Sequence, residues 1–74
     1  MSIDPNLPEV HNLLGNIKLN SGNIITSINY FKKAIELKPN FSGAFCNLGL
    51  AYKKLKNNEL ALENYYKAIN LKEL

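Results

Sequence analysis

The chain has 74 residues, of which 46% are hydrophobic and 20% charged, and nine lysines against six acidic residues give a net charge of +3. This length and composition predict one small globular domain and exclude a disordered chain. One cysteine and one histidine exclude an intramolecular disulfide and a multi-histidine metal site. The start, Met1-Ser2-Ile3-Asp4-Pro5, is unlike a secretory leader, and no apolar run approaches the roughly 18 residues of a membrane span. We therefore expect a cytoplasmic protein with no membrane partner.

Two helices are predicted in the first half of the chain. The first helix is indicated by an apolar stripe at i, i+3, i+4 and i+7, which consists of Val10, Leu13, Leu14 and Ile17. Pro8 precedes this stripe and suits the first turn of a helix. A turn follows at 20–23, in which Gly22 is expected to take a positive φ and Asn23 to cap the next helix. The stripe of that second helix consists of Ile24, Ile28, Phe31 and Ile35. Pro39 then ends it.

The second half repeats this plan. Its two apolar stripes are Ala44, Phe45, Leu48, Tyr52 and Leu55, followed by Leu62, Tyr65, Ala68 and Ile69. Between them, Asn57 or Asn58 is expected to turn the chain, because asparagine tolerates positive φ. No segment shows the period-two alternation of a β-strand. The predicted fold class is therefore all-α, with four antiparallel helices in two helix–turn–helix hairpins.

A single repeated unit underlies the two halves. Ten residues are identical to the residue 34 places later, namely Pro5/Pro39, Asn6/Asn40, Leu14/Leu48, Gly15/Gly49, Asn23/Asn57, Lys33/Lys67, Ala34/Ala68, Ile35/Ile69, Leu37/Leu71 and Lys38/Lys72. Such a recurrence is typical of stacked repeats and predicts an α-solenoid fragment. We divide the chain into repeat 1 at 8–41 and repeat 2 at 42–74. Residues 1–7 form a lead-in that resembles the end of a preceding repeat.

These residues resemble the tetratricopeptide repeat (TPR) family. The run 47–52 (NLGLAY) is similar to the first-helix signature of the family, and the small–aromatic–small spacing of its second helix is matched by Ala61, Tyr65 and Ala68. In the first copy the same pattern reads Leu14, Gly15, Phe31, Ala34 and Pro39. Small residues let two helices approach closely while the aromatic ring fills the space beside them.

Departures from the family pattern concentrate in the first copy. His11 stands where the family favours a large aromatic residue, which Phe45 supplies in the second copy. The first copy also has Lys18 in place of a tyrosine and Ser27 in place of an alanine. At the end of the second copy, Glu73 stands in place of a proline. We therefore expect the second hairpin to be the better packed of the two.

The resemblance implies a non-catalytic module for protein–protein recognition, without cofactor or metal, in which the first helices of the repeats line a concave groove. The groove residues that it implies are Glu9, Asn12, Asn16, Asn20, Cys46, Asn47, Leu50, Lys53 and Lys54. Asparagine amides both donate to and accept from the backbone of an extended peptide. Lys53 and Lys54 would attract an acidic partner. The alternative for these residues is a solvated helix face.

A second hypothesis is structural self-assembly. The second repeat should cover the apolar residues of the second predicted helix, whereas their counterparts in repeat 2 have no following repeat to cover them. These counterparts are Leu62, Tyr65, Ile69 and Leu71. An exposed apolar patch of this kind marks an association site. We therefore expect a homo-oligomer or a marginally stable monomer, and the sequence leaves open whether copies form a two-fold dimer or a head-to-tail filament.

Catalysis and nucleic-acid binding are less well supported. Cys46 and His11 are the only candidate pair of nucleophile and base, and no third group is evident to orient them. The lysines are dispersed over all four predicted helices, and arginine, the usual bidentate reader of bases, does not occur. We therefore expect neither an enzyme nor a nucleic-acid partner.

Overall fold

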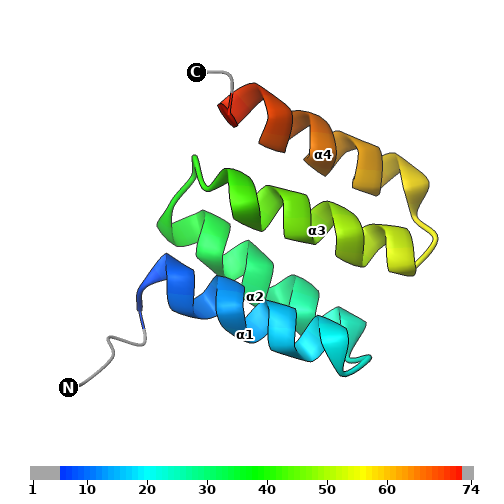
Figure 1. Ribbon diagram of the computed structural model, residues 1–74, viewed down its shortest axis with the longest axis horizontal. Helices are drawn as coiled ribbons and strands as arrows, with labels where there is room; N and C mark the ends of the chain where they lie inside the picture. Colours follow the sequence, from blue (N-terminus) through cyan, green and yellow to red (C-terminus); the bar gives the residue numbers. More distant parts are fainter. Residues whose placement is uncertain (1–5, 73–74) are drawn as a thin grey trace.

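Four α-helices make up the computed structural model, which describes residues 6–72 (Figure 1). They are α1 (Pro8–Asn20), α2 (Ile24–Leu37), α3 (Ser42–Lys54) and α4 (Asn58–Lys72). The described residues contain no strand, and the all-α prediction of two helical hairpins is confirmed. Residues 1–5 of the expected lead-in, and Glu73, where the family pattern has a proline, lie outside the described residues.

The ends of α1 follow from residues that the sequence singled out. Pro8 occupies the first helical position, where the backbone N–H that proline lacks would have no intrahelical partner. At the other end Gly22 has a φ of +88°, as predicted. The N–H groups of Gly22 and Asn23 donate to the carbonyls of Leu19 and Lys18 at 3.1 and 2.9 Å. These bonds satisfy carbonyl groups that a helix end otherwise leaves unpaired.

The turn of the second hairpin differs from the prediction. Lys56, rather than Asn57 or Asn58, takes the positive φ, at 63°. It does so because it is the counterpart of Gly22 in repeat 2 and the turn keeps the same backbone path in both copies. Asn57 instead caps α4, since its Oδ1 accepts the N–H of Leu60 at 3.3 Å.

The start of α2 also differs from the prediction that the side chain of Asn23 caps this helix. Asn23 does precede the helix, but its side chain makes no capping hydrogen bond. Its Nδ2 donates to the Oγ of Ser21 at 3.4 Å, while its backbone carbonyl accepts the N–H of Ser27 at 3.0 Å. The start of α2 therefore lacks the roughly 1 kcal/mol that a side-chain cap contributes to a helix.

Each hairpin closes on a contact between a glycine and an aromatic ring. A Cβ atom added to Gly15 would lie 2.5 Å from Cε1 of Phe31, and one added to Gly49 would lie 2.9 Å from Cδ1 of Tyr65. Any side chain at these two positions would push the helices of its hairpin apart. The small–aromatic pairing expected from the repeat pattern is therefore the contact that sets the spacing within each hairpin.

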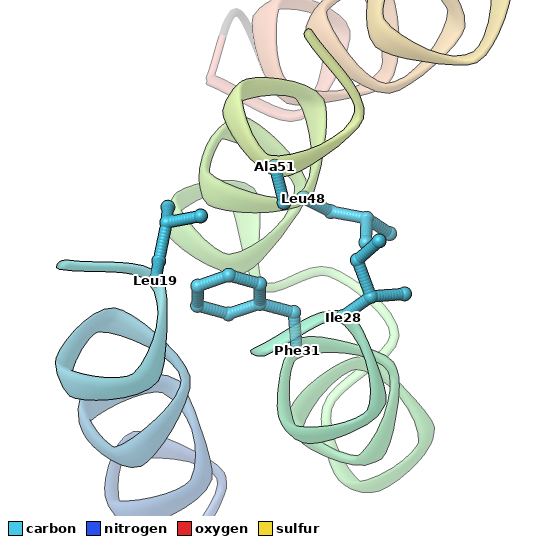
Figure 2. Packing of buried hydrophobic residues seen from close by; sticks show 5 residues of the cluster. All are labelled: Leu19, Ile28, Phe31, Leu48 and Ala51. Atoms are coloured by element: carbon cyan, nitrogen blue, oxygen red, sulfur yellow. The ribbon is translucent and has the colours of Figure 1, made fainter. Parts of the chain in front are cut away.

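The hydrophobic core lies where the two hairpins meet (Figure 2). Phe31 of α2 is fully buried at its centre, between Leu19 of α1 and the side chains of Leu48 and Ala51 of α3. Ile28 of α2 completes the cluster. α3 thus packs against α2 as well as against α4, and it touches α1, whereas α4 contacts only α3 among the described helices.

Burial of the aromatic residues runs opposite to the expectation that the second hairpin is better packed. Phe31 is fully buried, while Tyr65, its counterpart in repeat 2, is only half-buried. The cause is their position in the stack rather than the departures from the family pattern. α3 covers the ring of Phe31, and no described helix lies beyond α4 to cover Tyr65.

Candidate functional site

A hydrogen bond joins the first helices of the two hairpins. Nδ2 of Asn47 in α3 donates to Oδ1 of Asn12 in α1 at 3.0 Å, and both residues are half-buried. Within the described part of the chain, Nδ2 of Asn12 and Oδ1 of Asn47 make no hydrogen bond. The pair therefore offers one donor and one acceptor, which is what the backbone of an extended peptide requires.

The other predicted groove residues lie on the same two helices. Asn16 is half-buried, and the exposed members are Glu9, Asn20, Cys46, Leu50, Lys53 and Lys54. Glu9 has a partner already, because Nζ of Lys38 lies 3.8 Å from its Oε2. This ion pair is exposed and contributes little to stability. Lys53 and Lys54 lie in the last turn of α3, where positive charge also favours the helix itself.

A hollow between α3 and α4, which we call the α3–α4 groove, is the second surface of interest. Its volume is about 460 Å³, and it is lined by Ser42, Gly43, Cys46, Asn47, Tyr65, Ala68 and Ile69. It brings together members of both predicted sets. Cys46 and Asn47 were assigned to the peptide groove, while Tyr65 and Ile69 were assigned to self-association.

The residues predicted for self-association differ in exposure from their counterparts in repeat 1. Leu62 is 57% exposed, whereas Ile28, at the same place in repeat 1, is 6% exposed. Ile69 is 53% exposed, whereas Ile35 packs against the core cluster. Leu71 is half-buried. α4 therefore exposes a row of apolar side chains. The corresponding side of α2 is covered by α3.

His11 lies in a different part of the molecule from Cys46. It lines a shallow hollow of about 260 Å³ with Thr26, Asn29, Tyr30 and Lys33. Its ring lies 6.2 Å from the ring of Tyr30, centroid to centroid, and both of its nitrogens are buried without a hydrogen-bond partner among the described residues. Cys46 is exposed in the α3–α4 groove. The two residues line separate hollows, and the structure supports no catalytic pair between them.

Replacing His11 with phenylalanine is expected to stabilise the protein. The substitution removes two buried ring nitrogens without a hydrogen-bond partner, and such burial costs the native state about 1–3 kcal/mol. Phe45 shows that the same place in repeat 2 accepts a phenyl ring. The check is the free energy of unfolding from urea denaturation. The reciprocal variant Phe45→His is the control and is expected to lose stability; a His11→Phe variant less stable than the parent would contradict the prediction.

Neither a membrane span nor a metal site emerges from the part of the chain that the structure describes. None of its helices is long and apolar enough to cross a bilayer. Residues 6–72 also contain no group of three or more histidine, cysteine, aspartate or glutamate side chains that could hold a metal ion.

The hydrogen bond between Asn12 and Asn47 could not be found by comparing the two repeats. These residues stand one place out of step, because the counterpart of Asn12 in repeat 2 is Cys46 and the counterpart of Asn47 in repeat 1 is Leu13. The contact depends on how far α3 is displaced relative to α1. Ala68, by contrast, could have been assigned to the α3–α4 groove from the sequence, because it is identical to Ala34 at the same place in repeat 1.

Comparison with known proteins gives matches along most of the chain. The family described as TPR repeat matches residues 15–56, and the family described as tetratricopeptide repeat matches residues 42–73. A UDP-N-acetylglucosamine--peptide N-acetylglucosaminyltransferase of Giardia intestinalis is 36% identical over 70 residues, covering 89% of this chain and 5% of the transferase. The crystal structure of MamA matches with a TM-score of 0.86 and 27% identity, covering 89% of this chain and 39% of that one. The chain thus spans a small part of the transferase and about two fifths of the MamA chain.

Proposed function

The chain belongs to the tetratricopeptide repeat family, and we propose that it is a non-catalytic protein-interaction module that binds an extended segment of a partner protein along α1 and α3. The observation that carries the proposal is the hydrogen bond between Asn12 and Asn47. It holds two amides in place at the junction of the hairpins, so binding costs little side-chain entropy. The free donor and acceptor of the pair then bond to the peptide backbone.

The charge of the chain favours an acidic partner. The net charge is +3, and Lys53 and Lys54 are exposed at the end of α3, next to the proposed binding face. Exposed lysines increase the rate of association with an acidic segment more than they increase the final affinity. Binding of such a segment should therefore weaken as the salt concentration rises. No cofactor takes part in this mode of recognition.

Substitution of the amide pair tests the proposal. Peptides selected for binding from a random-sequence library are expected to bind Asn47→Ala and Asn12→Ala about tenfold more weakly, because each variant removes a hydrogen bond worth about 1.4 kcal/mol. Asn29→Ala, which changes an exposed amide on α2, is the matched control and should leave the affinity unchanged. Backbone NMR shifts on peptide addition should map to α1 and α3. Peptides that bind all three variants equally would refute this role for the face.

A second function, homo-oligomerisation, is supported by the exposure of Leu62 and Ile69 on α4. Their counterparts in repeat 1 are covered, and burying the same surface on α4 would add hydrophobic stabilisation of the same kind. In this role the chain would act as a structural unit whose copies associate through the α3–α4 groove. Sugar transfer is an activity of the Giardia protein named above, and we do not extend it to this chain, which covers 5% of that protein.

A further inference from the structure

We propose that the α3–α4 groove receives α1 of a second copy of this chain, so that copies stack head to tail. The proposal rests on the homo-oligomerisation proposed above and goes further, because it names the surface that enters the groove. Three features of the structure support it: the shape of the inner interface, the side chains that α1 presents, and the pairing of residues across the junction of the hairpins.

The interface between the two hairpins provides the pattern for this contact. Within the chain, Leu48 and Ala51 of α3 pack against Phe31 of α2, and all three are buried. The α3–α4 groove continues that interface by one more repeat, since Tyr65 takes the place of Phe31 and Ala68 repeats the buried Ala34. A helix that presents the same face as α3 therefore fits this groove.

α1 presents such a face. Leu14 and Ile17 are the counterparts in repeat 1 of Leu48 and Ala51, the two residues of α3 that enter the core. Ile17 is 53% exposed, and the neighbouring Leu13 is 59% exposed. Isoleucine is larger than the alanine at 51, so a docked copy lies farther away than the hairpins of one chain do. The contact is therefore weaker than the intrachain one and depends on concentration.

The pairing of Asn12 with Asn47 gives an independent argument for this register. Cys46 is the counterpart of Asn12, and Leu13 is the counterpart of Asn47. If successive copies are displaced as the two hairpins are, Cys46 of one copy therefore contacts Leu13 of the next. Both polar members of the inner pair are thus replaced by residues that need no hydrogen bond. Had only one of them changed, an amide would be buried without a partner at the cost that such burial carries. Leucine and cysteine suit a dry contact.

The two surfaces in this contact are different, so association does not close on itself as a two-fold dimer does. Each added copy offers a new α3–α4 groove at one end and a free α1 at the other. Each added copy also brings its own α1 and α3 beside those of the copy before it. A stack would therefore lengthen the face along α1 and α3 on which peptide binding is proposed.

Two charge substitutions separate the surfaces. Ile17→Lys disables α1 as the entering helix, and Ile69→Lys disables the groove; both side chains are 53% exposed, so the hairpins should fold, which circular dichroism checks. By light scattering, the parent chain is expected to grow beyond a dimer as its concentration rises. Each variant alone should be monomeric, with association weakened at least tenfold. An equimolar mixture should form a one-to-one dimer, because one intact α1 then meets one intact groove.

Every other outcome overturns the head-to-tail arrangement. If Ile17→Lys still dimerises while the mixture gains nothing, copies associate groove to groove, and homo-oligomerisation stands without this register. If the parent chain is monomeric up to its solubility limit, homo-oligomerisation fails as well, while peptide binding is untouched. Should Ile17→Lys unfold, Leu13→Lys replaces it, since Leu13 is still more exposed. The register itself is checked by Leu13→Cys, which should give disulfide-linked ladders with Cys46 on mild oxidation, whereas Ser21→Cys in the exposed turn should not.

Discussion

Replacing Phe31 with alanine is expected to cost about 3–5 kcal/mol of stability, the range for removing a buried phenyl ring. Phe31 is fully buried in α2 and packs against two other helices, α1 through Leu19 and α3 through Leu48 and Ala51. Its ring also fills the space beside Gly15. Small domains have only about 5–15 kcal/mol of stability in total, so this loss removes a large share of it. Thermal and urea denaturation followed by circular dichroism measure the effect.

Tyr65→Ala is the matched control for this substitution. Tyr65 occupies the same place in repeat 2 and lies over Gly49 in the same way, but it is half-buried because no described helix covers it as α3 covers Phe31. Its truncation should cost about 1–2 kcal/mol, since only part of its surface leaves water on folding. Equal losses for the two variants would show that cover by the next hairpin does not decide the contribution of this aromatic position.

Adding one more repeat is expected to raise stability by about 3–6 kcal/mol, which for a domain of this size corresponds to an increase in Tm of more than about 10 °C. The variant consists of residues 1–71 followed by a second copy of residues 38–74, so that a copy of α3 follows α4. That helix would cover Leu62 and Ile69, which are now more than half exposed, and would bury its own leucine against Tyr65. Differential scanning calorimetry at low protein concentration gives the change in Tm.

A control for this extension keeps its length and changes its packing. In the added segment, the copies of Leu48 and Ala51 are replaced by aspartate, which prevents the new helix from entering the α3–α4 groove. This variant should melt close to the parent chain. If it gained as much as the unaltered extension, the added stability would come from the new hairpin alone, and the α3–α4 groove would not be a surface that accepts a helix.

The fold was predictable because its determinants are local and occur twice. The start and end of α1 can be predicted without reference to any other helix. The signals are apolar residues at helical spacing, Pro8 at the start of the helix and Gly22 in the turn after it. The recurrence of the same pattern in repeat 2 then gives the second hairpin. The prediction for the second turn was wrong at Lys56, because intrinsic preference pointed to asparagine while the path of the flanking helices imposed the positive φ.

The candidate site was predictable only as sets of residues. The resemblance placed Asn12 and Asn47 on the same surface, and the structure joins them by a hydrogen bond. Their contact depends on the displacement and crossing of α1 and α3, which apolar spacing does not report. The same holds for Glu9, which was assigned to partner binding and lies beside Lys38 of the segment after α2. Which of the predicted residues bind a partner stays a prediction.

The way in which the helices contact one another has a consequence for how the chain reaches its native state. Among the described helices, contacts join neighbours along the chain, with α1 and α3 as the most distant pair. Forming any of them closes a loop no longer than about one repeat, which keeps the entropic penalty small. Chains dominated by such short-range contacts fold in microseconds to milliseconds. Each copy should therefore finish folding well before it meets another.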